Sequence, residues 1–527
     1  MYGRILGIHW APKVLASCAV IMMVSVMVLG HVPKIAFLAI TTTTLLTALS
    51  MIMTFRGATM WRWRRIRRAG NTPIVFGQYG SHNGLGLTWD GAGMHAWVEV
   101  SPGPPLALTT VSSGGHISQN PISLERLAKK MRQRDIVCDS IRLVTHAYRT
   151  ALPVTHPASA AVSDAIGPVP VHPCGRTFAV ITVSTIGALA AIRARARDGG
   201  IRATTWEAAS RVRVELEAQG FTAKGLTEKA LRALGSEQAA QVAPALEHIH
   251  NASLGDTASA KVFNVVARAG SWSARSQHLA RQIPAHRVYE NLAIVRESAG
   301  TLRAGYTASF VSRSDRIVRS LKGAGLRTAS GQQVSVLAQT MPMAAVPAPA
   351  IPLHSIADAD SPVAYPGGAG MYLGSSADLG RCFLRVDPGS GHTLWLLGSQ
   401  SFAHHMVLRM TLAATPISIQ LRADDPNRRG WEEFVRLVNS PLLTLGAANN
   451  AGIVVCAAED LARFAETEAT VIACTDQLAG QPEFSIVETG GNLVCTTGHN
   501  QVSVPWSMTA EERRYIPAIV SAAPATA

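Results

Sequence analysis

The stretch LWLLGSQSFAHHMVLRMTLAATPISIQLRADDPNRRGWEEFVRLV, residues 394–438, indicates how the C-terminal half of the chain folds. Two apolar runs of strand length, 394–397 and 417–421, are each followed by a helical pattern of apolar residues, over 400–413 and 431–438. The alternation continues with a strand at 453–457, a helix at 459–466 and a strand at 471–474. Strands that alternate with helices predict a parallel sheet with covering helices, so this half belongs to the α/β class.

The preceding part of the chain also mixes strands and helices. Strands are predicted on both sides of a turn at Asp90-Gly91, and again at 140–146 and 176–183. Apolar residues at helical spacing from Leu124 to Met131 predict an amphipathic helix with Ser123 as its N-cap. A capping box formed by Thr204 and Glu207 predicts the start of another helix.

Residues 343–366 are rich in Pro and Ala and are interpreted as a linker or long surface loop. The predicted organisation is an N-terminus at 1–13, a transmembrane hairpin at 14–55, a basic segment at 56–68, an α/β half at 70–342, the linker, a second α/β half at 367–516 and a flexible tail at 517–527.

The composition excludes several classes of protein. Of the 527 residues, 47% are hydrophobic and 16% are charged, which is incompatible with a disordered chain. The seven cysteines lie far apart without a CxxC pair, so neither a zinc module nor a disulfide framework is indicated. Reduced thiols in a cytosolic setting are the simplest interpretation.

The net charge of +14 is concentrated at the N-terminus. Nine of the 48 basic residues and none of the 34 acidic ones lie in residues 1–68, so the remaining chain carries only +5. A nucleic-acid-binding protein would need a basic stripe on a folded domain, and we expect no nucleic-acid partner.

Two uncharged runs, VLASCAVIMMVSVMVL at 14–29 and IAFLAITTTTLLTALSMIMTF at 35–55, approach the length of a membrane-spanning helix. The short connection between them predicts an antiparallel hairpin with helices at about 14–30 and 35–55. Arginines and tryptophans expected at the membrane interface follow the second run: Arg56, Trp61, Arg62, Trp63, Arg64, Arg65, Arg67 and Arg68. By the positive-inside rule this side is cytoplasmic, which makes the chain a multi-pass protein of the inner (plasma) membrane with its soluble part in the cytoplasm.

Two other interpretations of this region remain open. The first run resembles the apolar core of a signal peptide, but it is long and lacks a clear cleavage site. Even after cleavage, the second run and its arginines would leave residues 69–527 in the cytoplasm. The arginines are interpreted as a topology anchor that contacts anionic lipid rather than as a specific lipid site.

Common catalytic and cofactor motifs are absent from the sequence. There is no P-loop, no G-x-S-x-G and no H-E-x-x-H, and the glycines from Gly368 to Gly374 depart from the dinucleotide-binding pattern. Glu247-His248-x-His250 and the pair His404-His405 could ligate a metal, but solvated or capping histidines are favoured in both places. We therefore predict no catalytic, cofactor or metal site.

Two acidic pairs support an alternative enzymatic interpretation. Asp358 and Asp360 form a D-x-D, which holds a divalent metal in sugar-nucleotide transferases, but they lie in the Pro/Ala segment. Asp424 and Asp425 follow a predicted strand, where open α/β sheets bind ligands. The nearby arginines Arg422, Arg428 and Arg429 favour a charge-paired loop there.

Several stretches resemble the EccE family, the membrane-anchored core components of mycobacterial type VII (ESX) secretion systems. They are the hairpin with its Arg/Trp run, GLGLTWDGAGMHAWVEV at 84–100, LERLAKKMRQRDIVCDSIRLVTHAYR at 124–149, RTFAVITV at 176–183 and AHHMVLRMTLAATPISIQLRADDPNRRGW at 403–431. The family typically has Gln at the positions of His404 and His405, and its loop before Trp431 is shorter.

The resemblance implies a non-enzymatic structural subunit that supports protein export beside EccB-, EccC- and EccD-like subunits. Energy would come from the EccC ATPase, and the soluble fold would resemble a degenerate glycosyltransferase, an analogy of fold only. The alternatives are a membrane-tethered glycosyltransferase-like enzyme that uses a D-x-D metal site, and a lipid-sensing regulator that acts through its arginine cluster.

Overall fold

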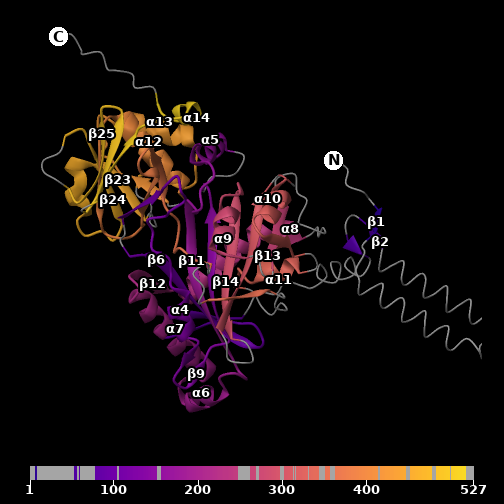
Figure 1. The fold of residues 1–527 in the computed structure, drawn as a ribbon. Coiled ribbons are helices and arrows are strands. Elements are labelled where there is room, and N and C mark those ends of the chain that lie inside the picture. Colours follow the sequence, from indigo (N-terminus) through magenta and orange to yellow (C-terminus); the bar gives the residue numbers. More distant parts are fainter. Residues whose placement is uncertain are drawn as a thin grey trace, which may run out of the picture.

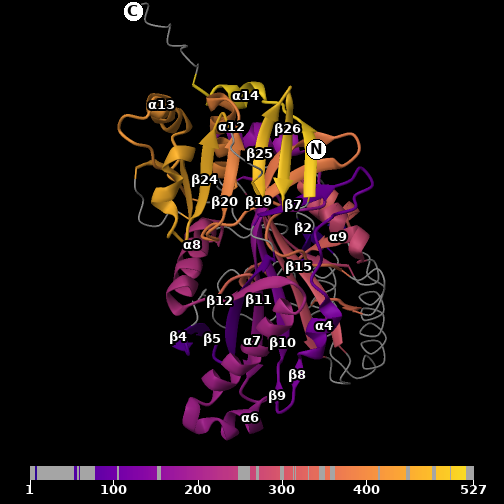
Figure 2. The same cartoon turned by 90° about the vertical axis from the view of Figure 1, so that its left-hand side faces the viewer.

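The computed structural model shows a mixed α/β protein with several sheets (Figure 1). It describes residues 6–8, 53–55, 58–59, 78–103, 106–150, 156–246, 261–268, 272–296, 302–312, 314, 316–329, 332–342, 351–356, 362–413, 416–446, 452–477, 482–498 and 500–517. In both ribbon views, the second half of the chain lies at one end of a large sheet that is built by the first half (Figures 1 and 2).

The first sheet is antiparallel throughout and has the order β16-β13-β15-β14-β10-β11-β6-β5-β4, with β12 paired to β6 and β17 paired to β15. Its strands are β4 (Gln78–His82), β5 (Leu85–Trp89), β6 (Gly93–Pro102), β10 (Ser140–Tyr148), β11 (Cys174–Ser184), β12 (Phe221–Gly225), β13 (Lys261–Ala267), β14 (Arg287–Arg296), β15 (Leu302–Ser312), β16 (Leu326–Thr328) and β17 (Leu353–Ser355). The turn predicted at Asp90-Gly91 is confirmed, because Trp89 pairs with Met94 across the β5–β6 hairpin.

Both faces of this sheet are buried because apolar residues occupy consecutive positions of its central strands. On β11, Ala179 and Ile181 belong to the large core that also contains Val212 and Leu216 of α7 (Ile201–Glu217). Phe178 and Val180, at the alternate positions, pack with Leu231 and Leu234 of α8 (Glu228–Leu246). Since neighbouring side chains of a strand point to opposite faces, α7 and α8 cover opposite sides of the sheet.

Shorter helices complete the first half: α4 (Leu124–Lys129), α6 (Leu189–Ala194), α9 (Ala274–Arg281), α10 (Ile317–Gly323) and α11 (Gln333–Ala338). The predicted N-cap of α4 is confirmed, because the Ser123 side chain accepts a hydrogen bond from the Arg126 amide. The predicted capping box at Thr204 is wrong. Helix α7 has its N-cap at Gly200, four residues earlier, and the Thr204 hydroxyl donates to the Gly200 carbonyl.

The second half contains the predicted parallel sheet, in the order β22-β21-β23-β24-β20-β25-β26-β27, with the last two strands added antiparallel. Its strands are β20 (Thr393–Leu397), β21 (Ile417–Ile419), β22 (Leu443–Leu445), β23 (Ile453–Ala457), β24 (Thr470–Thr475), β25 (Phe484–Thr489), β26 (Asn492–Thr497) and β27 (Asn500–Pro505). The associated helices are α12 (Gln400–Leu412), α13 (Arg428–Val438), the 3-10 helix η3 (Ala458–Phe464) and α14 (Ala510–Arg513).

The first half of the chain contributes one strand and one helix to the core of the second half. Strand β7 (Leu106–Val111) of the first half pairs with β19 (Gly380–Val386), which pairs with β18 (Met371–Ser376), and this small sheet packs in the core of the second half. Helix α5 (Pro157–Ile166) also comes from the first half and contributes Val162 and Ile166 to that core. The core of the second half is therefore incomplete without residues that lie far upstream.

The predicted transmembrane hairpin and basic segment lie outside the described residues, apart from two strand pairs. Leu6–Ile8 (β1) pairs antiparallel with Met53–Phe55 (β2), and β2 pairs with Ala58–Thr59 (β3). Residues 53–55 lie in a strand and not in the helix predicted at 35–55, which corrects that boundary. Among the residues that the structure describes, no helix is both long and apolar enough to cross a membrane.

Candidate functional site

A cleft with a volume of about 850 Å³ opens where the end of the first sheet meets the second half. Residues of β6, β11 and β12 form one wall, and residues 384–392 form much of the other. Its charged and titratable side chains are Glu99, Tyr148, Cys174, Arg176, Lys224, Arg385, Asp387 and His392. This cleft is the candidate site that the fold itself creates.

Most of the charge in the cleft is already paired. Arg176 donates to both carboxylate oxygens of Glu99, at 2.6 and 2.8 Å, and this pairing raises the pKa of Arg176. The Nε atom of Arg385 donates to Asp387. Burial raises the pKa of Asp387 even though the charge of Arg385 opposes the shift. The cleft therefore offers ion pairs and backbone rather than a pair of free carboxylates.

The cleft lies at the amino ends of the parallel strands. It is lined by His392, Pro416 and Gly452, each of which immediately precedes one of those strands. Open α/β sheets usually bind ligands at the opposite, carboxyl edge. The position of the cleft is thus unlike that of a nucleotide site in a doubly wound sheet.

At the carboxyl edge, a side chain of the protein accepts the hydrogen bond of a backbone amide that could otherwise bind a ligand. The Glu488 carboxylate accepts hydrogen bonds from the amide and the hydroxyl of Ser399, both 2.9 Å, at the N-terminus of α12. An acidic side chain is favourable at this position because the first amides of a helix lack intrahelical partners. The chain itself thereby fills a position where an anionic ligand would otherwise bind.

The loop after β21 places Asp424 and Asp425 at this edge, as predicted, but with different partners. Asp425 accepts from the Asn427 amide at 2.7 Å. The predicted pairing with arginines is wrong in its details, because Arg422 lies 2.5 Å from the buried Asp460 and Arg428 pairs with Glu432.

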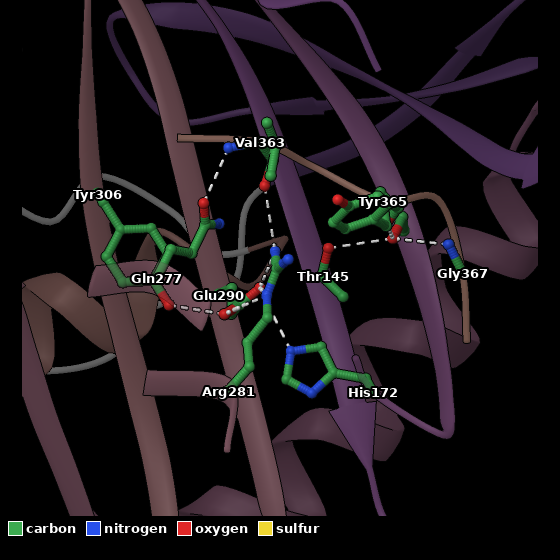
Figure 3. A network of polar contacts seen from close by, with 10 residues as sticks. Thr145, His172, Gln277, Arg281, Glu290, Tyr306, Val363, Tyr365 and Gly367 are labelled. Atoms are coloured by element: carbon green, nitrogen blue, oxygen red, sulfur yellow. Dashed lines mark hydrogen bonds and ion pairs between the residues drawn. The ribbon is translucent and has the colours of Figure 1, made fainter. Parts of the chain in front are cut away.

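A buried polar network joins the first sheet to the segment that leads into the second half (Figure 3). The side chains of Arg281 on α9 and Glu290 on β14 are each 4% exposed, and Arg281 donates to Glu290 at 2.9 Å. The Tyr306 hydroxyl donates to the other Glu290 oxygen at 2.7 Å. His172 lies 3.3 Å from Glu290, at ion-pair distance but without hydrogen-bond geometry.

The charges of this network stabilise one another. Burial alone would raise the pKa of Glu290, but Arg281 and His172 outweigh it and hold the pKa well below its usual range. Burial likewise opposes the charge of Arg281, and Glu290 outweighs that effect and raises the pKa of Arg281. Both groups therefore remain charged inside the protein, which requires their mutual contact.

The network holds the end of the predicted linker. Val363 donates its amide to Gln277 at 2.8 Å and accepts from Arg281 at 3.3 Å. The Gly367 amide donates to the Thr177 hydroxyl at 3.0 Å. Upstream, β17 pairs with β15. The described parts of 343–366 are therefore bound to the first sheet rather than forming an exposed linker.

A second buried network ties the C-terminal helix to α12. Arg409 donates to Glu512 at 2.9 Å and to the carbonyls of Tyr372, Leu373 and Ser507. His405 lies 3.1 Å from Glu512 and accepts a hydrogen bond from the indole of Trp506 at its Nδ1. Because an indole can only donate, His405 is the neutral tautomer that carries its proton on Nε2 and donates it to Glu512.

The interpretation of His404 and His405 as solvated or capping histidines is wrong. Their residues are 1% and 0% exposed, and burial lowers the pKa of each to about 4. His404 stacks on Phe434 and meets the edge of Trp431, and neither of its ring nitrogens has a hydrogen-bond partner among the described residues. The prediction failed because α12 is buried on all sides from Phe402 onward, so it has no polar face.

Other predicted site residues lie outside the described part of the chain. They are Arg56, Trp61, Arg62, Trp63, Arg64, Arg65, Arg67, Arg68, Glu247, His248, His250, Asp358 and Asp360. Within the described ranges, no three His, Cys, Asp or Glu side chains come close enough to hold a metal ion. Sequence reasoning missed Arg281, Glu290 and Glu512. An arginine within an otherwise apolar helix, such as Arg409 in α12, was the available signal that a buried carboxylate must lie nearby.

The sequence matches no protein-family model and no curated protein.

Proposed function

We propose that this chain is a membrane-anchored, non-enzymatic subunit of an inner-membrane type VII (ESX) secretion complex, which it stabilises by holding a rigid cytoplasmic body beside its neighbours. The observation that supports a structural role is that the buried ion pairs connect distant segments of the chain. Arg281 and Glu290 hold the connecting segment, and Arg409 and Glu512 hold the C-terminal helix. Both pairs join parts of the chain to one another and are enclosed by protein.

The anchoring part of the proposal depends on the two apolar runs and the arginines that follow them. The antiparallel pairing of Leu6–Ile8 with Met53–Phe55 supports it, because it brings the two ends of the segment 9–52 together. A hairpin that crosses the membrane twice has both of its ends on the same side.

The secretion part depends on the resemblance to EccE, whose most extensive stretch lies at 403–431. In this chain that stretch builds α12 and β21 in the middle of the second core. The expected partners are EccB-, EccC- and EccD-like subunits, and the basic segment at 56–68 would contact anionic lipid.

Extraction in a mild detergent, followed by mass measurement of the intact assembly and identification of the co-purifying chains, tests the proposal. We expect an assembly that contains the three partner subunits. A matched sample that lacks residues 1–70 should release the cytoplasmic body from the membrane. Recovery of the full chain as a single particle, from membranes that contain the partners, would refute the proposal.

The second candidate is a membrane-tethered glycosyltransferase-like enzyme. The position of Asp424 and Asp425 in the loop that follows β21, at the carboxyl edge of the parallel sheet, favours it. Asp358 and Asp360 would supply the D-x-D. Calorimetric titration of the purified chain with Mn²⁺ and a nucleoside diphosphate decides between the two candidates. Binding that is lost in Asp424→Ala, Asp425→Ala or in Asp358→Ala, Asp360→Ala would favour the enzyme.

A further inference from the structure

The end of the first sheet that lies farthest from the second half carries an exposed apolar turn. Ile186 is 90% exposed and Leu189 is 46% exposed, where β11 leads into α6. Helix α6 and strand β9 (Ile136–Val137) form the extremity of the molecule in both ribbon views (Figures 1 and 2). Below, the arginine tip means the residues 132–137 and 185–198 at this extremity.

Exposed arginines lie on both segments of the arginine tip. Arg132, Arg134, Arg193 and Arg197 are all exposed, and none has an ion-pair partner among the described residues. The tip holds two acids, of which Asp135 pairs with Arg195 and Asp198 is exposed, so its five arginines leave a net charge of +3. Just outside the tip, Asp139 accepts from the amide and hydroxyl of Ser184. The arginine tip therefore combines one protruding aliphatic residue with unneutralised positive charge.

The chain enters the folded body at this same end of the sheet. Gln78, where the described body begins, pairs with Trp89, next to the Asp90–Gly93 turn. Gly93 in turn pairs with Ser184, which directly precedes the arginine tip. Only nine residues lie between Arg68 and Gln78, and an extended chain over these ten Cα-to-Cα steps spans at most about 35 Å. An anchor at 14–68 would thus keep the arginine tip within reach of the bilayer surface.

We propose that the arginine tip docks on the anionic surface of the membrane, with Ile186 inserted among the headgroups and the arginines on lipid phosphates. This inference rests on the proposed membrane anchoring. A lipid surface fits better than an acidic protein because the apolar part is a single protruding turn without a groove. Shallow insertion of an aliphatic residue ringed by long basic side chains is the pattern of peripheral membrane contact.

The test uses the full chain reconstituted in nanodiscs of phosphatidylcholine alone or mixed with phosphatidylglycerol. Ile186→Cys is labelled with an environment-sensitive fluorophore, in a background with Cys18→Ser and Cys474→Ser. Leu379→Cys is the matched control, since Leu379 is a 38% exposed leucine of the second half. We expect the label at 186 to shift to the blue and to be quenched by lipid-borne quenchers in anionic discs only, and the label at 379 to remain in water in both.

Variants that remove arginines provide the second part of the test. Arg193→Gln with Arg197→Gln should lower the ratio of docked to undocked protein by about fivefold for each arginine removed. Arg429→Gln with Arg513→Gln, which changes exposed arginines of the second half, should leave the ratio unchanged. Raising the salt to 1 M should also undock the tip, because the screening length falls to about 3 Å.

Three outcomes would overturn the docking inference. They are a label at 186 that stays in water in anionic discs, equal insertion in neutral and anionic discs, and protection that appears only when an acidic partner protein is added. Flotation of the same chain with vesicles reports the anchoring separately. A chain that floats with a water-exposed tip refutes only the docking, whereas a chain that does not float refutes the anchoring as well.

Discussion

Two adjacent histidines provide a stringent test of how this structure holds polar groups in its interior. His404 and His405 are both fully buried in α12 and differ only in their partners. Replacing each in turn by leucine, which is close to histidine in volume, separates burial from hydrogen bonding. We expect opposite effects on the free energy of unfolding.

The magnitudes follow from the contacts. His405→Leu removes a hydrogen bond to the charged Glu512 and leaves the indole N–H of Trp506 without its acceptor. A hydrogen bond to a charged group contributes about 1.5–3 kcal/mol, so we expect a loss of about 2 kcal/mol. His404→Leu removes two buried nitrogens without partners, each of which costs about 1–3 kcal/mol, at the expense of about 1 kcal/mol of ring stacking. This variant should be more stable than the parent by about 1 kcal/mol or more.

Urea unfolding of the full chain in mild detergent, followed by tryptophan fluorescence at constant m-value, measures both variants. His405→Gln is the control, because a glutamine can donate to Glu512 and accept from Trp506, and it should recover most of the loss. Equal destabilisation by the two leucine variants would refute the reasoning, since burial rather than hydrogen bonding would then decide the outcome.

Four further predictions concern other parts of the molecule. The pKa of His404 is about 4 in the folded chain, below its value in the unfolded chain. The stability that depends on this neutral histidine is therefore complete above about pH 6.5 and is lost as the pH falls toward 4. His404→Leu should reduce this loss by up to about 1.4 kcal/mol per pH unit, measured by urea unfolding across that range. Arg281→Met should destabilise the chain by about 3–5 kcal/mol and speed hydrogen exchange at the Val363 and Gly367 amides. The double variant Arg281→Met, Glu290→Leu should recover part of the lost stability. If the effects of the two changes simply added, the pairing would be contradicted. Burial raises the pKa of Cys138, Cys174 and Cys495 to about 12, so alkylation at pH 8, followed by mass spectrometry, should be at least about a thousandfold slower in the folded chain than in urea. Gly370→Ala should cost more than about 3 kcal/mol in thermal unfolding, because its Cβ would meet the Leu384 carbonyl at a φ of +106°, whereas Gly91→Ala, at +95° in open space, should cost about 1 kcal/mol.

Local periodicity identified the second half correctly because each of its strands and helices forms from one continuous stretch of sequence. The parallel direction of these strands follows from the alternation, whereas the strand order that places β20 beside β24 does not. The failures arose where a distant segment decides the environment of a residue. Helix α12 has an amphipathic pattern, but distant segments cover what would be its polar side. Arg409 bonds to the carbonyls of Tyr372 and Leu373 in β18, to the Ser507 carbonyl and to Glu512 in α14.

The buried networks were harder to predict for the same reason. Glu512 lies 103 residues from Arg409, and Val363 lies 82 residues from Arg281, so no local pattern links them. The start of α7 was missed because Thr204 and Glu207 fit a capping box, whereas two glycines with positive φ already turn the chain into the helix. In each case tertiary contacts outweighed a weak local preference.

The pairing of β7 with the distant strand β19 has a consequence for synthesis of the chain. Residues 106–111 leave the ribosome about 270 residues before their pairing partner, β19, is made. At about 5–20 residues per second, this strand waits for roughly a quarter of a minute to a minute with one edge and its apolar face unsatisfied. A nascent chain with such an exposed apolar strand is a substrate for chaperones. Strand β7 of the first half cannot reach its final place until translation has passed into the second half.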